Sequence, residues 1–289
     1  MTTATNTSNH PTIAVIGGTG HTGRRVADRL RARGLDVRIG SRSGSPAFYW
    51  ESPETWAPVL NGCTAAYVAY TPDFTHSGAV ETLAAFAKQA RRSGLERLVF
   101  LSGRGEDDAL RAEGVMRAAG VPTAVLRSSM FAQNFSEHFL HGAIFDGVIA
   151  LPAGGVAEPF LDLEDLADVA ERVLTAPVPS EETLDLTGPR LLTFAEAAAQ
   201  ISMVLGRPLI YQPVTLSEFV EGALDAGVPA EEVDALRLVF EQIFDSRNAY
   251  VTDTIERMLG RPAGDFAAYA RRAAASGAWS LDPREEVSA

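Results

Sequence analysis

The sequence is short of the residues on which several protein classes depend. One cysteine, Cys63, in 289 residues excludes an intramolecular disulfide and a cysteine-based zinc site. No apolar run approaches the roughly 20 residues that a membrane-spanning helix needs. Basic residues number 25 against 37 acidic ones, and the net charge of -12 disfavours binding to phosphate backbones and anionic lipid. The expected partner is therefore a small molecule, with neither nucleic acid nor membrane.

The N-terminus also lacks the features of a targeting signal. Residues 1–10 (MTTATNTSNH) have neither a cationic start nor an apolar core, so we expect a disordered lead-in to a cytoplasmic protein. The rest has ordinary globular composition, with 46% hydrophobic and 21% charged residues. The length suits one large domain or a domain with an added lobe.

Apolar strand patterns alternate with amphipathic helix patterns through the first half of the chain. This alternation predicts an α/β fold, a Rossmann-type doubly wound parallel sheet. After Arg127 the rhythm changes, with one helix expected at Phe135–His141 and a possible return to the sheet at Thr183–Leu186. The six expected strands are Thr12–Gly17, Asp36–Gly40, Ala47–Trp50, Thr64–Tyr70, Arg97–Ser102 and Thr123–Arg127.

From Thr193 onward the pattern is mostly helical. The chain is therefore expected to comprise an NAD(P)-binding domain at 11–190 and a smaller, mainly helical C-terminal lobe at 191–289. Such a lobe covers the crevice at the carboxyl ends of the strands, where open α/β sheets bind ligands.

A glycine-rich turn stands at the first strand–helix junction. Gly17, Gly20 and Gly23 in GGTGHTG give the spacing of a dinucleotide-binding loop. The first permits a tight turn, the second lets the backbone approach a pyrophosphate, and the third lets helix and strand pack closely. The pyrophosphate then meets free N–H groups at the helix N-terminus. This context predicts nucleotide binding.

The end of the second strand indicates which dinucleotide is bound. NAD-selective sites place a carboxylate there to bind the ribose hydroxyls. This chain has Ser41, Arg42 and Ser43 instead, and no acid before Glu51. A guanidinium pairs well with the 2′-phosphate of NADP, and serine hydroxyls add hydrogen bonds. The expected cofactor is NADP(H).

Several segments resemble the NmrA-like atypical short-chain dehydrogenase/reductases. They are GGTGHTG, LVFLSG, AVLRSSMFAQNF and, near the C-terminus, LGRPAGDFAAYA. GSRSGSP followed by FYWESPETW is similar to the branch that contains ergot-alkaloid-type iminium reductases and NAD(P)H quinone oxidoreductase-like proteins. The resemblance covers roughly residues 12–279. It departs at Tyr49, where the branch often carries an acid; a tyrosine there suits stacking on adenine.

The resemblance implies roles only where residues match. It places Tyr70 and Thr71 in a loop beside the cofactor, Ser102 near the nicotinamide, and Phe131 with Asn134 at the substrate pocket. The residues that it implies for binding NADP are Gly17, Thr19, Gly20, Thr22, Gly23, Ser41 and Arg42.

One part of the usual machinery of this superfamily is missing. Carbonyl-reducing members commonly use Tyr-x-x-x-Lys, in which the lysine lowers the pKa of the proton-donating tyrosine. Lys88 is the only lysine in the chain, and Ala84 stands four residues before it. The two dyad positions align at about Asp107 and Arg111, and arginine is no substitute for a compact ammonium. An iminium accepts hydride without an acid, whereas an enone or quinone needs another donor, such as Ser102, Tyr70 or water.

Residues after the sixth strand have two interpretations each. Met130 and Phe131 suit a pocket wall and a plain core equally. His138 and His141, three apart on the expected helix, have no third ligand that completes a metal site, so no metal is expected. His138 follows Asn134 by one helical turn, which brings it within reach of substrate.

Three functions remain open at this point. The first is an NADP(H)-dependent oxidoreductase that passes hydride to a small cyclic or conjugated substrate, such as an imine or iminium, an enone or a quinone. The second is an NADP-binding redox sensor without turnover, and the third is a non-redox isomerase or cyclase on the same scaffold. A monomer or a homodimer is expected.

Overall fold

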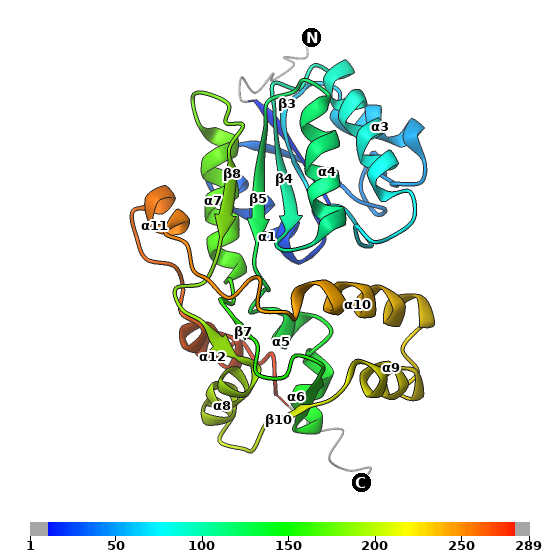
Figure 1. The fold of residues 1–289 in the computed structure, drawn as a ribbon. Coiled ribbons are helices and arrows are strands. Elements are labelled where there is room, and N and C mark those ends of the chain that lie inside the picture. Colours follow the sequence, from blue (N-terminus) through cyan, green and yellow to red (C-terminus); the bar gives the residue numbers. More distant parts are fainter. Residues whose placement is uncertain (1–10, 281–289) are drawn as a thin grey trace, which may run out of the picture.

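The computed structural model describes residues 11–280 and shows a six-stranded sheet (Figure 1). The residues expected to form a lead-in, 1–10, lie outside the described part. Every neighbouring pair of strands is parallel, in the order β2-β1-β3-β4-β5-β8. This confirms the predicted Rossmann-type sheet. Its strands are β1 (Thr12–Ile16), β2 (Asp36–Gly40), β3 (Cys63–Val68), β4 (Arg97–Gly103), β5 (Thr123–Ser128) and β8 (Thr183–Leu186).

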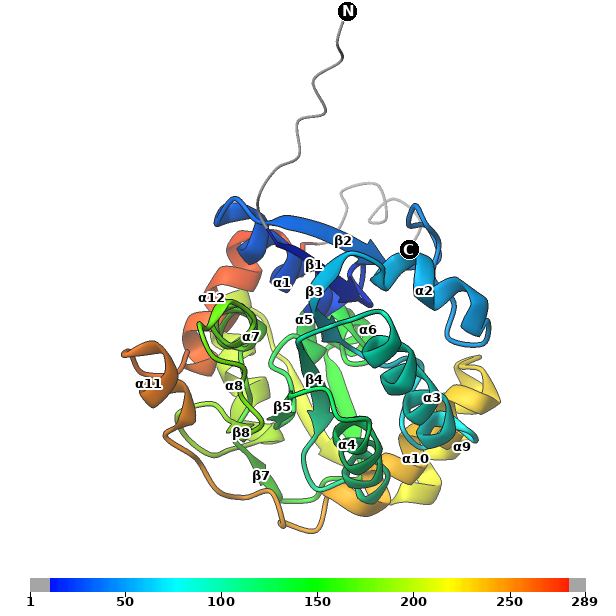
Figure 2. The same ribbon diagram turned by 90° about the horizontal axis from the view of Figure 1, so that it is seen from above.

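Helices cover both faces of the sheet (Figure 2). On one face α1 (His21–Ala32) packs along α7 (Leu163–Thr175), and both bury aliphatic residues against the strands. The opposite face carries a short 3-10 turn at Pro53–Thr55, α2 (Trp56–Leu60), α3 (Ala79–Arg92) and α4 (Asp107–Ala118). Because the central strands β1, β3, β4 and β5 are mostly buried under helices on both faces, they are rich in apolar residues in the sequence.

The expected strand at Ala47–Trp50 is wrong. The backbone N–H of Phe48 bonds to the Ser41 carbonyl, and that of Tyr49 bonds to the Thr55 hydroxyl, so neither joins a strand ladder. Phe48 and Trp50 instead insert their rings beside Phe86 of α3. The apolar, aromatic composition that suggested a strand belongs to a loop anchored by its side chains.

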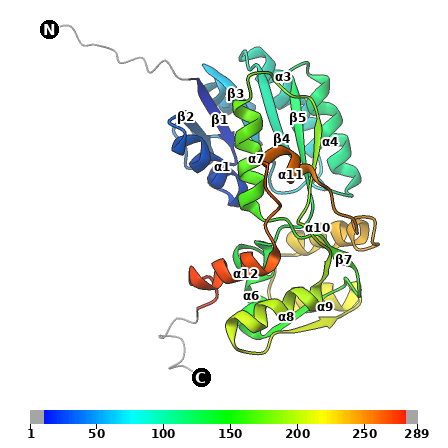
Figure 3. The ribbon, with the colours of Figure 1, turned by 90° about the vertical axis from the view of Figure 1, so that its left-hand side faces the viewer.

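The second part of the chain forms a lobe below the carboxyl ends of the strands (Figures 1 and 3). An aromatic cluster holds its core, with Phe135 at 5.5 Å from Phe160 and 5.3 Å from Phe266 between ring centroids. The later elements of the lobe are β6 (Val148–Leu151), β7 (Ala157–Glu158), β9 (Leu192–Thr193), α8 (Phe194–Leu205), β10 (Ile210–Pro213), α9 (Leu216–Asp225), α10 (Ala230–Ile243) and α12 (Phe266–Ala275). One further late helix, α11 (Thr254–Leu259), packs on α7 of the sheet domain instead. The division at 190/191 stays a prediction.

The single helix expected at Phe135–His141 is also wrong. The chain forms two short helices, α5 (Asn134–Glu137) and α6 (His141–Asp146). His138 between them has extended backbone angles, φ -139° and ψ -158°, which end the first helix. His138 and His141 therefore do not share a helix face. His141 bonds to the carbonyl of Ala278, whereas His138 faces a cavity.

No helix within residues 11–280 combines the length and apolar character that a membrane crossing requires.

Candidate functional site

A cavity of about 750 Å³ lies between the carboxyl ends of the strands and the lobe. Its volume falls in the range of small-molecule and cofactor sites. The structure brings together around it most residues singled out from the sequence. These are Gly17, Thr19, Gly20, Thr22, Ser41, Arg42, Tyr70, Thr71, Ser102, Met130, Phe131, Asn134 and His138.

The glycine turn forms one end of this cavity. Gly17 has φ +77°, a conformation that favours glycine, and its carbonyl accepts a hydrogen bond from the N–H of Gly20. Gly20 is the N-cap of α1, but it has no side chain to cap the helix, and the first turn contains no acid. The N-terminus of α1 therefore presents N–H groups and the positive end of its dipole to the cavity, which suits a phosphate.

Gly23 does not line the cavity but lies behind the turn. A Cβ atom on Gly23 would overlap the Gly17 carbonyl oxygen and would come within 2.8 Å of the Gly18 Cα. The absence of a side chain thus lets α1 start directly against the turn. This close packing keeps the helix N-terminus pointed at the cavity.

The residues after β2 form the adjoining wall. Ser41 is buried, whereas Arg42 is exposed, and both line the cavity. Within residues 11–280 no hydrogen bond or ion pair involves the Arg42 guanidinium. Tyr49, which also lines the cavity, lies beside Arg42 with its hydroxyl 3.5 Å from the Arg42 carbonyl oxygen. A free guanidinium beside a hydroxyl and a ring suits the 2′-phosphate and adenine of NADP.

The other basic side chains near the turn already have an acidic partner. Arg24, Arg25 and His21 of α1 all contact the carboxylate of Glu137 in α5. Although burial raises the pKa of Glu137, the hydrogen bonds from His21 and Arg25 prevail and lower it to about 2. Glu137 is therefore ionised at neutral pH, and the pairs tie α1 to the lobe.

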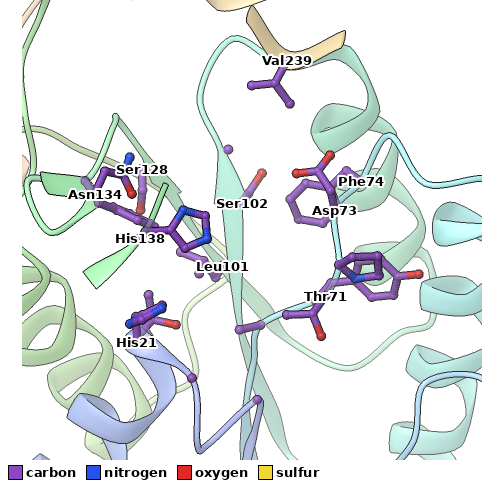
Figure 4. Close-up of a pocket in the computed structure, with 18 of the residues that line it drawn as sticks. His21, Thr71, Asp73, Phe74, Leu101, Ser102, Ser128, Asn134, His138 and Val239 are labelled. Carbon is purple, nitrogen blue, oxygen red and sulfur yellow. The ribbon is translucent and has the colours of Figure 1, made fainter. Parts of the chain in front are cut away.

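The far end of the cavity has apolar walls. Phe74 and Tyr70 stack with ring centroids 6.1 Å apart, and Phe131 also lines the cavity. Figure 4 shows Ser102 between Asp73 with Phe74 and, opposite, His138 with Asn134 and Ser128. The lobe closes this end through one face of α10, whose contributions are Leu236, Val239, Phe240 and Ile243.

Ser102 is held in a buried hydrogen-bond network. Its hydroxyl donates to Glu113 of α4 at 2.7 Å, and Arg127 of β5 binds the same carboxylate through two bonds of 2.9 and 2.5 Å. Glu113 is 3% exposed. Because a hydroxyl has one proton, Ser102 presents lone pairs, not a proton, to the cavity.

Tyr70, a donor suggested by the sequence, and His138, expected to contact substrate, are both weak proton donors. Burial raises the pKa of the Tyr70 phenol, and no lysine lies beside it to counter that effect. Desolvation, assisted by the nearby His21, lowers the pKa of His138 below its usual 6.5. At neutral pH the His138 ring is therefore mostly uncharged, and a neutral imidazole is a poor acid.

Three polar residues that also line the cavity, Arg104, Ser128 and Glu158, are together called the polar floor. Each is at most 5% exposed. Arg104 Nη2, Ser128 Oγ and Glu158 Oε1 find no hydrogen-bond partner within residues 11–280. Burial raises the pKa of Glu158 to about 7, against the opposing effect of Arg104. Buried polar atoms without partners are rare, so this floor suits polar atoms of a ligand or water.

Sequence reasoning missed several residues of the site. Asp73, Glu106, Arg104 and Glu158 fall in loops or short strands, where no periodic pattern singles them out. The face of α10 is an ordinary amphipathic pattern in the sequence, and only the tertiary fold directs it into a cavity. One feature of the sequence could have pointed to Glu106: it directly precedes Asp107, the position that aligns with the tyrosine of the missing dyad.

In the part of the chain that the structure describes, no three His, Cys, Asp or Glu side chains are grouped to hold a metal ion.

Comparison with known proteins gives relatives over nearly the whole chain, although no family model matches it. The chain is 32% identical over 270 residues to the uncharacterized oxidoreductase YesF of Bacillus subtilis, covering 89% of this chain and 94% of that one. It is 30% identical over 248 residues to agroclavine dehydrogenase of Claviceps fusiformis, covering 76% and 83%. Among solved structures, the triphenylmethane reductase of Citrobacter sp. complexed with NADP(H) matches with TM-score 0.75 and 22% identity, over 91% of this chain and 99% of that one.

Proposed function

This chain belongs to the NmrA-like atypical short-chain dehydrogenase/reductases, and from that premise we propose that it reduces a small cyclic or conjugated organic molecule with NADPH. It is an NAD(P)H-dependent oxidoreductase. Its substrate and the residues that act on it are our proposal. A monomer or homodimer acting in the cytoplasm is part of the same proposal.

One observation carries the proposal: a single cavity joins the glycine turn and Arg42 to the aromatic pocket at Ser102. The residues present fit NADP(H). The uncapped N-terminus of α1 suits the pyrophosphate, and the unpaired Arg42 suits the 2′-phosphate. Ser102 and Thr71 then lie beside the nicotinamide half, between the turn and the aromatic pocket.

When bound, the nicotinamide supplies hydride to an electrophilic carbon of the substrate. The chain contributes orientation and exclusion of water. Phe74 and Phe131 offer flat surfaces to a conjugated ring, and α10 covers the strand ends with apolar side chains. Such positioning in a dry site lowers the barrier without covalent chemistry by the protein. The polar floor binds a polar substituent of the substrate.

Arg42→Ala is expected to weaken NADPH binding by roughly 10- to 100-fold, because one charge-assisted interaction with phosphate is worth about 1.5–3 kcal/mol. NADH lacks the 2′-phosphate, so its affinity should change by less than about threefold. Titration of the intrinsic fluorescence with each dinucleotide measures both constants. Arg257→Ala on α11, at an arginine whose side chain is 59% exposed, is the matched control and should alter neither. Equal losses for the two dinucleotides would refute the role of Arg42.

The reaction is tested by the loss of NADPH absorbance with a panel of acceptors. The panel contains a cyclic iminium, a conjugated enone and a quinone. Reduction of at least one acceptor at the expense of NADPH is expected. Tight NADPH binding with no turnover of any acceptor would contradict the proposal and would favour the redox-sensor alternative.

A further inference from the structure

Glu106 brings a carboxyl group into the cavity, and none of the other side chains in the described part of the chain pairs with it. It is the N-cap residue of α4, yet its side chain makes no capping hydrogen bond. Within residues 11–280 its carboxyl has neither a hydrogen bond nor an ion pair. The carboxyl instead lies directly over Gly103, so close that a Cβ atom on Gly103 would overlap Glu106 Oε1. A glycine at this position thus makes room for the acid.

The position of this carboxyl relates it to the reacting region. Gly103 ends β4 and directly follows Ser102, and all three residues line the same cavity. Asp73 and Phe74 stand across from Ser102 (Figure 4). Glu106 therefore lies at the strand end where the substrate meets the nicotinamide in the proposed function.

The surroundings favour the protonated form of the carboxyl, which is only partly exposed. Burial, reinforced by the negative charges of Asp73 and Asp108, raises the pKa of Glu106 to about 8. Among residues 11–280 no cation offsets these effects: Arg247 is paired with Asp245, and the Arg104 guanidinium is directed to Asp185 and the Tyr250 ring. The helix dipole of α4 favours the ionised form, but burial prevails. From α10 the cavity receives only apolar side chains, namely Leu236, Val239, Phe240 and Ile243.

We propose that Glu106 is the proton donor for neutral acceptors, taking over the task of the tyrosine in the missing dyad. This inference rests on the proposed function. The new C–H bond forms at the electrophilic carbon of an enone or quinone, and the electron pair of the broken π bond moves to oxygen. The Glu106 O–H bond breaks and its proton goes to that oxygen. The carboxylate left behind takes a proton from water, and NADPH is oxidised to NADP⁺.

The two classes of acceptor differ in whether their reduction needs an acid. A neutral enone or quinone needs the proton of Glu106. An iminium is already positive, so hydride alone neutralises it and no acid is required. A variant that lacks the acid should therefore separate the two classes of acceptor.

Glu106→Gln is expected to lower kcat/KM for a quinone or enone by roughly 10²-fold or more, the usual contribution of a positioned general acid. Reduction of an iminium should change by less than about threefold. Glu106→Asp, which keeps a carboxyl, should restore part of the lost activity. Asp107→Asn removes a neighbouring exposed carboxylate and should affect neither acceptor. Thermal unfolding of each variant checks that it is folded.

Two further readouts separate proton donation from a structural role. With a neutral acceptor, kcat/KM of the unaltered protein should fall about tenfold per pH unit above pH 8 and show a solvent deuterium isotope effect, and Glu106→Gln should lose both. With an iminium, kcat/KM should not fall over that range, because an ionised carboxylate attracts the cation. Gly103→Ala should reproduce the loss for neutral acceptors, since its methyl group displaces the carboxyl while the acid is still present.

The outcomes are distinguishable from failure of the proposed function. If no acceptor is reduced, the oxidoreductase proposal itself fails. If the unaltered protein reduces the iminium but no neutral acceptor, Glu106 has no proton to deliver and the inference is overturned. It is equally overturned if Glu106→Gln reduces neutral acceptors at the normal rate with an unchanged pH profile.

Discussion

Gly23→Ala is expected to abolish useful NADPH binding and to destabilise the protein. The new methyl group would overlap the Gly17 carbonyl oxygen and lie 2.7 Å from the Gly17 carbonyl carbon. These are backbone atoms, which cannot rotate away as a side chain can, so α1 must shift from the turn. Overpacking of this kind costs about 3 kcal/mol at the upper end of its usual range.

The loss of affinity follows from the same displacement. The pyrophosphate depends on N–H groups of the turn and of the first turn of α1, whose directions are set by this packing. Losing two hydrogen bonds to a charged acceptor, each worth about 1.5–3 kcal/mol, weakens binding by roughly 10²-fold or more. NADPH titration and urea unfolding measure the two effects.

Gly222→Ala provides a matched control for the same substitution. Gly222 is an exposed residue inside α9, and a Cβ atom there would have no neighbour within 4 Å. Alanine is favoured over glycine inside a helix by up to about 1 kcal/mol, so this variant should be slightly stabilised and bind NADPH normally. Similar losses in both variants would contradict the steric explanation for Gly23.

The sheet and the cofactor half of the site were predictable because their signals are local. A strand buried on both faces requires a run of apolar residues, and a phosphate-binding turn requires glycines at set spacings. Both requirements are met within Thr12–Gly23. The preference for NADP could be predicted for the same reason, since it depends on the absence of a carboxylate among the few residues around Arg42.

The predictions that were wrong or missing concern segments whose structure is determined by residues distant in the sequence. Ala47–Trp50 has strand-like composition, but the hydrogen bonds from Phe48 to Ser41 and from Tyr49 to Thr55 hold it as a loop. The helix expected at Phe135–His141 breaks at His138, although no proline or glycine marks the break. The task proposed for Glu106 depends on its position over Gly103 and on a cavity that α10, much later in the chain, also lines.

The second large effect is expected for Arg127→Met, which should destabilise the protein by about 3–5 kcal/mol. Arg127 supplies two hydrogen bonds to Glu113, whose side chain is 4% exposed. Without the guanidinium, a carboxylate remains buried with the Ser102 hydroxyl as its main partner. Removing one member of a buried pair usually costs this much, because the other charge is left uncompensated. Urea unfolding measures the change.

A double-mutant cycle separates the buried charge from lost packing. Combining Arg127→Met with Glu113→Gln removes the charge but keeps an oxygen that accepts from Ser102, so the double variant should recover at least about 2 kcal/mol of the loss. Arg111→Met, at an arginine whose side chain is 70% exposed and pairs with Asp108, should cost less than about 0.5 kcal/mol. If the double variant is as unstable as Arg127→Met alone, lost packing and not the unpaired carboxylate explains the effect. Recovery of stability would instead show that Arg127 is needed chiefly to neutralise the buried Glu113 carboxylate. Glu113 in turn accepts the proton of the Ser102 hydroxyl, so that the lone pairs of Ser102 face the cavity.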